Sequence, residues 1–272
     1  MNAVVLAGGK GTRLAPYTRV FPKAMMPIGD MPILEIILGQ MKRAGILNIT
    51  LTVGNLAGLI YAIFQNGGEL GINIRYSKEK EPLGTAGSLS IVEGLDETFL
   101  VTNGDVLSLI DLRDLIRFHY EHEGICTIAM HERAVKIDLG VIELNGGFEV
   151  RNYIEKPSVD YKVSMGVYVF EPRVLDFIPS GEYLDFPDLV KKLLSAGEKV
   201  VGYPFNGYWR DLGNPAEYEE VSQDFEAMRP QFIGKKGVTG TLNSLVLGSV
   251  NRKAQDVKQN EVQTVHTTAE WD

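Results

Sequence analysis

A short apolar strand that runs directly into a glycine-rich turn constrains this chain more than any other feature. The segment Ala3–Leu6 is apolar, and the turn that follows it, residues 7–13, contains three glycines. Glycines let the backbone fold tightly and turn its N–H groups toward a ligand, because no Cβ atom stands in the way. Arg13 and Lys23 add two positive charges nearby. A turn of this kind is suited to binding a polyphosphate.

Two better-known glycine loops do not fit the turn. The P-loop requires GxxxxGK[ST], whereas this chain continues with TRL after its last glycine. The dinucleotide fingerprint GxGxxG fits Gly9 and Gly11 but meets Leu14 where the third glycine belongs. That fingerprint also needs an acid after the second strand, where this chain has Gly54. Hydride transfer is therefore disfavoured.

The first half of the chain alternates strand-like and helix-like segments. The expected strands are Ala3–Leu6, Ile49–Val53, Ile72–Tyr76 and Phe99–Thr102. Apolar residues at helical spacing lie between them, with Leu34, Ile37, Leu38 and Met41 on one face and Leu56, Leu59, Ile60 and Ile63 on another. This order predicts an α/β fold in three layers, with a Rossmann-like, mostly parallel mixed sheet and helices on both faces. Ligands bind such sheets at the carboxyl ends of the strands, where the glycine turn and the Gly104-Asp105 pair both lie.

The second half is expected to extend the same sheet. Strand-like segments at 125–132, 139–144, 148–157 and 165–172 follow closely on one another, and the sequence NGG at 145–147 indicates a hairpin. Helices are expected at Phe186–Ala196 and Pro215–Met228, with a strand at Val200–Phe205 between them. No linker interrupts residues 1–229, which should form one domain. Residues 230–272 form a polar tail, in which 241–250 is either a strand pair or one rung of a hexapeptide helix; the tail could also be an oligomer contact.

Composition excludes several classes of partner. A net charge of −8 argues against nucleic acid, because no excess of Lys and Arg exists to neutralise a phosphate backbone. No apolar run of 18 residues and no apolar signal-peptide region exist, so we expect a cytoplasmic protein that binds no membrane. Cys126 lies in an apolar segment, which predicts a buried strand position in a reducing compartment. His119, His122 and His131 have no spacing typical of zinc ligands, which favours structural or solvated roles.

The glycine turn and its continuation resemble the N-terminal signature of the sugar-1-phosphate nucleotidyltransferases. That signature reads GGxGTRLxPxTxxxPKxMxPIxxxPxL, and this chain reads GGKGTRLAPYTRVFPKAMMPIGDMPIL from Gly8 to Leu34. The resemblance implies transfer of a nucleotidyl group from a nucleoside triphosphate to a sugar 1-phosphate, which yields an NDP-sugar and pyrophosphate. In that reaction a sugar phosphate oxygen attacks the α-phosphorus in line, and catalysis consists of positioning and of charge neutralisation by Mg²⁺, Arg and Lys.

Roles for particular residues follow from the resemblance. Arg13, Lys23, Asp105 and Asp211 are implied to be catalytic, and the two aspartates are implied to be the Mg²⁺ ligands, although their spacing alone would not have paired them. The implied nucleotide-binding residues are Leu6, Ala7, Gly8, Gly9, Gly11, Thr12, Arg13, Glu81, Gly84, Thr85 and Gly104. The implied sugar-phosphate residues are Gly140, Glu155, Lys156 and Gly166. At Ser164 the chain departs from the family, where many relatives have an asparagine that contacts the sugar.

Specificity and the rival functions remain open at this point. The stretch EPLGTAG, Glu81–Gly87, is most similar to mannose- and glucosamine-type guanylyltransferases, which favours guanine and a hexose or heptose 1-phosphate. Thymidylyl-, uridylyl- and cytidylyltransferases of the same family are the alternatives. A metal-dependent glycosyltransferase would need DxD, but Val106 and Leu107 follow Asp105. A non-catalytic nucleotide-sugar-binding module would be expected to have lost Lys23 or one of the aspartates. A homo-oligomer is possible.

Overall fold

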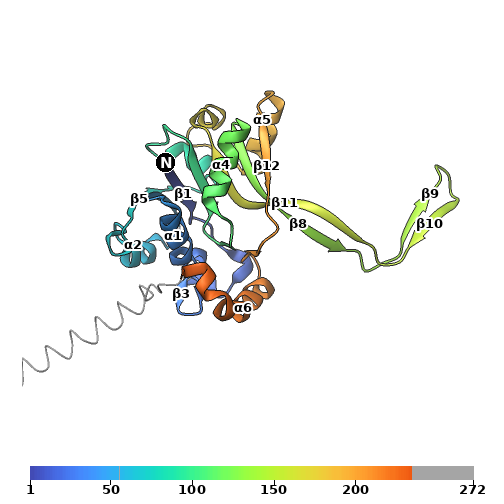
Figure 1. The fold of residues 1–272 in the computed structure, drawn as a ribbon, viewed down its shortest axis with the longest axis horizontal. Helices are drawn as coiled ribbons and strands as arrows, with labels where there is room; N and C mark the ends of the chain where they lie inside the picture. Colours follow the sequence, from blue (N-terminus) through green and yellow to red (C-terminus); the bar gives the residue numbers. More distant parts are fainter. Residues whose placement is uncertain (55, 235–272) are drawn as a thin grey trace, which may run out of the picture.

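The computed structural model describes residues 1–54 and 56–234, and these residues form a central sheet of seven strands (Figure 1). The strand order is β12-β8-β11-β6-β1-β4-β5. The bounds are β1 Asn2–Leu6, β4 Asn48–Val53, β5 Asn73–Lys78, β6 Phe99–Asn103, β8 Cys126–Lys136, β11 Ser158–Phe170 and β12 Val200–Pro204. β11 runs antiparallel to both of its neighbours, and every other pair in this sheet is parallel. The expected mixed, mostly parallel sheet is confirmed.

Alternate side chains of β1 enter two separate cores on opposite faces of the sheet. Ala3 and Val5 belong to one core, and Val4 belongs to the other. Helices α1, α2, α4 and α6 contribute to the first core, whereas α3 and α5 contribute to the second. Their bounds are α1 Ile33–Ala44, α2 Ala57–Phe64, α3 Gly84–Gly87, α4 Leu112–His122, α5 Phe186–Ser195 and α6 Pro215–Ile233. The three expected layers are therefore present.

Local signals explain where the longer helices begin and end. Asp111 caps α4, because its carboxylate accepts hydrogen bonds from the backbone N–H groups of Arg113 and Asp114. Asn214 caps α6 in the same way, by accepting from the N–H of Glu217 at 3.0 Å. α1 ends at Ala44, and the residue that follows, Gly45, has a φ of 88°, which suits glycine.

The two expected helical faces fared differently. Leu34, Ile37, Leu38 and Met41 are all buried in α1, as predicted. The second face was partly wrong, because Leu56 precedes α2 and Leu59 is 37% exposed. The buried side chains of α2 are instead Ala57, Ile60 and Phe64, which share one side of the helix at spacings of three and four.

The last helix continues beyond the expected domain boundary at residue 229. α6 extends to Ile233, and both Phe232 and Ile233 are buried in the first core. The tail predicted for residues 230–272 therefore begins within a packed helix. Residues 235–272, including the strand pair or hexapeptide rung expected at 241–250, lie outside the described residues.

Cys126 and His119 are both buried in the structure. Cys126 is fully buried in β8, and burial raises the pKa of its thiol, so it is an inert packing residue. His119 is also buried, and its two ring nitrogens contact Thr127 and Glu171.

Among the described residues, none of the helices combines the length and the apolar character that crossing a bilayer would require.

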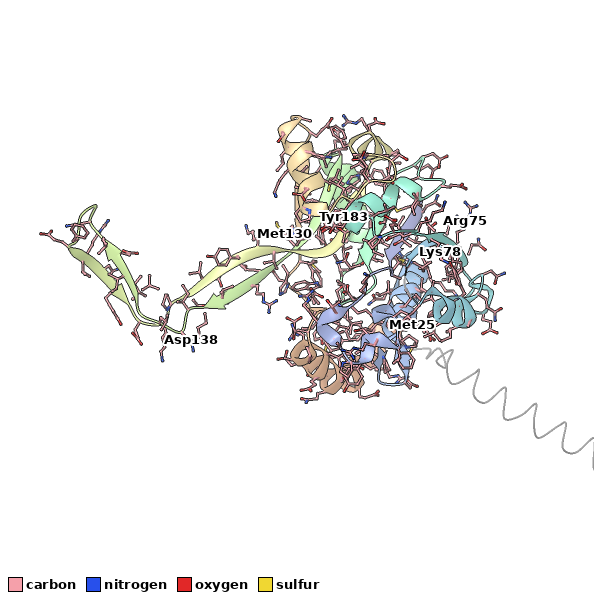
Figure 2. All side chains as sticks on the ribbon, turned by 180° about the vertical axis from the view of Figure 1, so that it is seen from behind. Met25, Arg75, Lys78, Met130, Asp138 and Tyr183 are labelled. Atoms are coloured by element: carbon pink, nitrogen blue, oxygen red, sulfur yellow. The ribbon has the colours of Figure 1, made fainter. Side chains whose placement is uncertain are left out.

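The distal parts of β8 and β11 leave the sheet as a two-stranded ribbon that projects far from the body (Figures 1 and 2). The two strands remain paired from Met130↔Ser164 to Lys136↔Ser158. A hairpin of β9, Val141–Leu144, and β10, Val150–Ile154, continues the ribbon and confirms the NGG turn signal. We call residues 131–163 the arm and the other described residues the body.

Candidate functional site

A pocket of about 860 Å³ lies at the carboxyl ends of the parallel strands. Leu6 ends β1, Lys78 ends β5 and Asn103 ends β6, and all three line the pocket. Seven of the predicted site residues also line it: Leu6, Gly8, Gly9, Glu81, Gly84, Thr85 and Asp105. Residues that are far apart in the chain meet here because parallel strands present their carboxyl ends at one edge of the sheet.

Specific contacts fix two of the predicted glycines, Gly11 in the glycine turn and Gly104 just after β6. Gly11 has a φ of +60°, and a Cβ there would lie 2.8 Å from Thr18 Cγ2. Thr18 Oγ1 also donates a hydrogen bond of 2.7 Å to the Gly11 carbonyl, which fixes the turn. Gly104 donates its N–H to the Leu6 carbonyl at 2.9 Å, and a Cβ there would lie 2.8 Å from the same oxygen. The positive φ and the Thr18 side chain favour glycine at position 11, and the Leu6 backbone oxygen leaves no room for a Cβ at position 104.

The predicted catalytic side chains form one charged cluster. Lys23 Nζ donates a hydrogen bond to Asp105 Oδ2 and lies 3.9 Å from Asp211 Oδ1. The Lys23 side chain is only 11% exposed. A Cβ placed on Gly213 would lie 3.1 Å from both Arg13 Nη2 and Asp211 Oδ1, so the guanidinium and this carboxylate flank the same glycine.

Strand pairing explains how the two aspartates come together. β7, Val106–Ser108, pairs antiparallel with β13, Trp209–Asp211, so that Asp211 lies opposite Val106. The N–H of Leu212 donates a hydrogen bond of 3.0 Å to the Asp105 carbonyl, which holds the start of β7 against the end of β13. This short sheet lies outside the central one, and sequence spacing gave no signal of it.

The cluster holds two cations and two carboxylates, and the surroundings of Asp211 disfavour the charge of that carboxylate. Burial raises the pKa of Asp211, and the neighbouring Asp105 carboxylate raises it further, whereas Lys23 and Arg13 act in the opposite direction. The upward shift in the pKa means that the ionised form of Asp211 is disfavoured in the protein alone. A further cation at this point would relieve that cost.

The donor set fits Mg²⁺, which prefers oxygen ligands and is commonly held by one or two carboxylates together with phosphates and water. Asp105 and Asp211 would supply two carboxylates. No group of three or more His, Cys, Asp or Glu side chains that could hold a metal occurs in the described part of the chain. Phosphate oxygens and water would therefore have to complete the coordination.

Asp185 is a pocket residue that sequence reasoning missed. Its Oδ1 accepts hydrogen bonds from the N–H of Thr85 at 3.0 Å and from Thr85 Oγ1 at 3.1 Å, and its Oδ2 accepts from the Tyr183 hydroxyl at 2.6 Å. Burial alone would raise the pKa of Asp185, but these hydrogen bonds outweigh it and lower the pKa. Asp185 occupies the N-cap position of α5, yet its side chain does not cap α5 and instead bonds to Thr85 in α3.

Asn103 is a second missed residue, and it explains why Gly166 is a glycine. Its Oδ1 is buried at the pocket without a hydrogen-bond partner. A Cβ on Gly166 would lie 2.6 Å from Asn103 Nδ2, and the φ of Gly166 is +73°. Gly166 therefore packs directly against a side chain that lines the pocket. An unpaired buried acceptor of this kind is available to a ligand hydroxyl or amine.

Three of the predicted sugar-phosphate residues are not brought to the pocket. Gly140, Glu155 and Lys156 lie on the arm and are exposed or half-buried. Glu155 Oε2 accepts a hydrogen bond of 3.2 Å from the Tyr153 hydroxyl, another arm residue. None of the residues that line the pocket belongs to the arm. Their role in binding the sugar phosphate stays a prediction.

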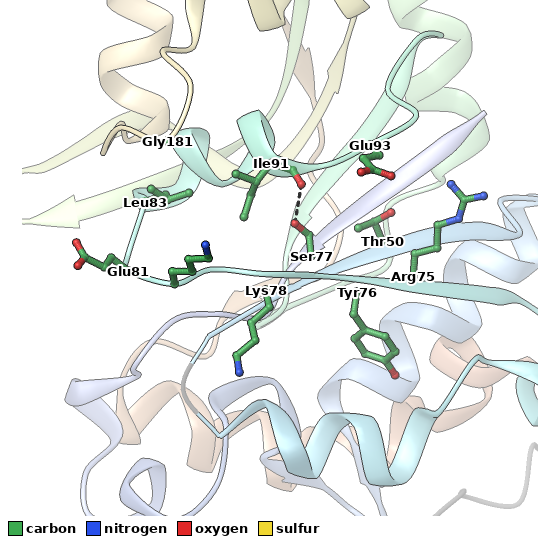
Figure 3. Close-up of a pocket in the computed structure, with 11 residues that line it drawn as sticks. Thr50, Arg75, Tyr76, Ser77, Lys78, Glu81, Leu83, Ile91, Glu93 and Gly181 are labelled. Atoms are coloured by element: carbon green, nitrogen blue, oxygen red, sulfur yellow. Dashed lines mark hydrogen bonds between the residues drawn. The ribbon is translucent and has the colours of Figure 1, made fainter.

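A neighbouring pocket of about 680 Å³ lies against the edge strand β5 (Figure 3). It shares Lys78, Lys80 and Glu81 with the first pocket, so this segment forms a wall between the two. Figure 3 shows the hydrogen bond of 2.9 Å that Ser77 Oγ donates to the Ile91 carbonyl across this second pocket. Glu81 is the one predicted site residue that lines it, so the first pocket is the candidate for the chemistry.

Comparison with known proteins places the chain in a family. The family model described as nucleotidyl transferase matches residues 2–228. The mannose-1-phosphate guanylyltransferase of Mycobacterium tuberculosis is 35% identical over 247 residues, which covers 87% of this chain and 68% of that protein. The UTP–glucose-1-phosphate uridylyltransferase of a Synechocystis strain is 33% identical over 238 residues and covers 80% of this chain. Since the match covers 61% of that second protein, the chain spans roughly two thirds of the length of these relatives.

Solved structures agree in fold. A crystal structure from Bacillus anthracis superposes with a TM-score of 0.69 at 21% identity, covering 89% of this chain and 99% of that one. HddC from Yersinia pseudotuberculosis, crystallised with GMP-PN, superposes with a TM-score of 0.63 at 22% identity, covering 82% of this chain and 99% of that one. Together with the matched family model and the relatives above 30% identity, these comparisons show that the chain belongs to the sugar-1-phosphate nucleotidyltransferases of the nucleotidyl transferase family.

Proposed function

We propose that this chain transfers a nucleotidyl group from a nucleoside triphosphate to a sugar 1-phosphate, with release of pyrophosphate. The observation that carries the proposal is the placement of the Lys23 ammonium between Asp105 and Asp211, next to a glycine-lined pocket that Asp105 lines. Cations and carboxylates in this arrangement suit phosphoryl chemistry, in which catalysis depends on holding phosphates in line and neutralising their charge.

Each part of the cluster has a distinct task in this reaction. The backbone N–H groups of the glycine turn hold the triphosphate. Lys23 and Arg13 neutralise the charge that develops as a sugar phosphate oxygen attacks the α-phosphorus and pyrophosphate leaves. Asp105 and Asp211 would hold a Mg²⁺ ion, which supplies further charge neutralisation when it is bound. The unpaired Asn103 Oδ1 would accept a hydrogen bond from a hydroxyl of the substrate.

The proposed substrates are GTP and a hexose or heptose 1-phosphate. The segment Glu81–Gly87, whose sequence favours guanine, supplies Glu81, Gly84 and Thr85 to the pocket. Similarity to a mannose-1-phosphate guanylyltransferase supports this choice. Similarity to a uridylyltransferase keeps UTP as the second candidate. Glu155, Lys156, Gly140 and Gly166 are proposed to bind the sugar phosphate.

A pyrophosphate-exchange screen tests the proposal. Purified protein is incubated with labelled pyrophosphate, Mg²⁺ and each NDP-sugar in turn, and label entering the triphosphate is measured. Exchange with a GDP-sugar above all others is expected, whereas preferred exchange with a UDP- or dTDP-sugar would overturn the choice of base alone. Tight nucleotide binding without exchange on any sugar would show a binding module instead of an enzyme.

A further inference from the structure

Among the residues that the structure describes, most of the exposed large apolar side chains lie on the arm. Nineteen large apolar side chains are exposed among the described residues, and eleven of them lie between residues 135 and 161. Phe148 is 100% exposed, Leu139 is 73% exposed and Val150 is 61% exposed. An isolated two-stranded ribbon is marginally stable in water, and a segment with this many exposed apolar side chains indicates an interaction site. The arm therefore requires a partner surface.

The edges of the arm are also unpaired. β12 accompanies β8 only as far as Pro204↔Met130, and β6 accompanies β11 only from Val167↔Thr102 onward. Within residues 1–54 and 56–234, β8 and β11 pair only with each other beyond these points, and so do β9 and β10. Each outer edge thus presents free backbone N–H and C=O groups, which another chain can use.

The charges of the arm favour a second copy of this chain as that partner. The arm contains five Lys and Arg and six Asp and Glu, interspersed along both strands, within a chain of net charge −8. A nearly neutral arm with both signs mixed does not repel another copy of itself or an acidic body.

The body offers three exposed apolar side chains next to the glycine turn. Tyr17, Val20 and Phe21 are 60%, 62% and 50% exposed. They belong to the segment that closes the glycine turn, because Thr18 within it is bonded to the Gly11 carbonyl. These exposed apolar side chains therefore lie next to the predicted triphosphate site.

We propose that two copies of this chain exchange arms, so that each arm covers the partner's segment 17–21 and brings Glu155 and Lys156 to the partner's pocket. The second part rests on the proposed function, because it assigns these two residues to the sugar phosphate. No residue of the chain's own arm lines its pocket, so the site lacks these groups until another copy supplies them. A twofold exchange uses the same contact twice and closes the assembly.

Sedimentation equilibrium of the full chain tests the assembly without reference to activity. The expected mass is twice 30.1 kDa. The double variant Leu139→Asp with Phe148→Asp, and separately Val20→Asp, should give monomers with unchanged circular dichroism. The matched control is Leu194→Asp, which changes a residue 57% exposed on α5 and should remain dimeric. A monomeric wild type, or a dimer that survives both arm and body variants, would overturn the proposal.

Mixed dimers test whether the arm acts in trans. A Lys23→Ala copy has a defective body and an intact arm. A Lys156→Ala copy has an intact body and a defective arm. Co-expression with two different tags and double purification isolates the mixed dimer. Exchange of arms gives one intact site in two, so about half of the wild-type turnover should return. No recovery in a stable mixed dimer would show that each arm serves its own body.

A crosslink separates failure of this proposal from failure of the proposed function. Phe148 is replaced by benzoylphenylalanine, and unlabelled and ¹⁵N-labelled copies are mixed and irradiated. Links between differently labelled copies, mapped to residues 17–21, are expected. Links confined to one copy overturn arm exchange even if the enzyme is active. An inactive wild type overturns the proposed function, while the crosslink still decides the position of the arm.

Discussion

Lys23 Nζ donates a hydrogen bond to Asp105 Oδ2, although 82 positions separate the two residues in the chain. Lys23 begins a short 3-10 turn after Pro22, and Asp105 lies at the corner between β6 and β7. The same ammonium is 3.9 Å from Asp211 Oδ1. One nearly buried cation thus serves two carboxylates, and an incoming phosphate has to compete with them for it.

Replacement of Lys23 by alanine should lower kcat by about a thousand-fold, because a preorganised cation next to developing negative charge has an effect of that order. KM for the nucleotide should change far less, since this contact strengthens in the transition state. Steady-state kinetics on the preferred substrate pair, with circular dichroism as the check of folding, measure both.

Lys191→Ala is the matched control for that prediction. Lys191 lies on the surface of α5, is 75% exposed and pairs with Asp188 three residues earlier. Its removal should leave both constants unchanged, because exposed ion pairs contribute little. A raised KM with normal kcat in Lys23→Ala would make Lys23 a ground-state anchor.

Replacement of Asp185 by asparagine should reduce the free energy of unfolding by about 1 to 2 kcal/mol at neutral pH, since hydrogen bonds to a charged acceptor are lost. The pKa of Asp185 is lowered in the folded protein from an ordinary value of 3.8. Its contribution is therefore fully present above that value and disappears as the pH falls through the folded pKa. Urea denaturation between pH 7 and pH 3 should show the gap between wild type and variant closing.

Asp188→Asn provides the comparison for the pH series. Asp188 is 59% exposed and pairs with Lys191 at the surface. Its variant should unfold like the wild type at every pH. A pH-independent gap for Asp185→Asn would mean that packing, and not the charge, gives Asp185 its effect.

Alanine at Gly166 should destabilise the protein by about 1 to 3 kcal/mol, the range for a residue forced into a sparsely populated backbone conformation. The added Cβ would also press on Asn103 at 2.6 Å and displace a side chain that lines the pocket. Gly146→Ala separates these effects, because Gly146 has a φ of +91° but no atom within 4 Å of the added Cβ. Thermal melts should show a loss in both variants, whereas KM should rise only in Gly166→Ala.

Much of the sheet was predictable from the sequence because its signals are local. The apolar runs at Ile49–Val53 and Phe99–Thr102 predicted β4 and β6 to within one residue at each end. The helical face of α2 was misplaced, because apolar spacing does not show where a helix begins, and this one begins at Ala57. The path of the arm was not predictable, since the strand pattern of residues 125–172 is the same whether the hairpin folds onto the body or leaves it.

The candidate site was predictable only in part. The glycine turn and Asp105 could be placed together because both follow parallel strands. The approach of Asp211 depends on the β7–β13 pair, a contact between distant segments that no spacing rule reveals. Asp185 and Asn103 escaped notice because their importance comes from which side chain they contact in three dimensions.

Deletion of residues 235–272 should leave kcat within a few-fold of wild type, because every proposed site residue precedes α6. A chain that ends at residue 229 should behave differently. It would lose Phe232, fully buried in the first core, and the hydrogen bond that Arg43 donates to the Phe232 carbonyl. Removal of a buried aromatic side chain costs about 3 to 5 kcal/mol, so this shorter chain should melt at a much lower temperature. Loss of activity in the chain ending at Gly234, with its fold intact, would contradict the prediction and place a catalytic contribution in the tail.

Asp105→Asn and Asp211→Asn should each abolish metal-dependent turnover, and the double variant should be hardly worse than either alone. Both carboxylates would hold one ion, so the first substitution already removes the function that the second could impair. Stability should not follow activity in Asp211→Asn. Burial and the neighbouring Asp105 raise the pKa of Asp211, so loss of its charge should leave the free energy of unfolding unchanged or increase it. Chelation by EDTA should stop the wild-type reaction and added Mg²⁺ should restore it. Additive losses in the double variant would show that the two aspartates do not share a catalytic ion, and turnover that persists in EDTA would show that the reaction needs no metal.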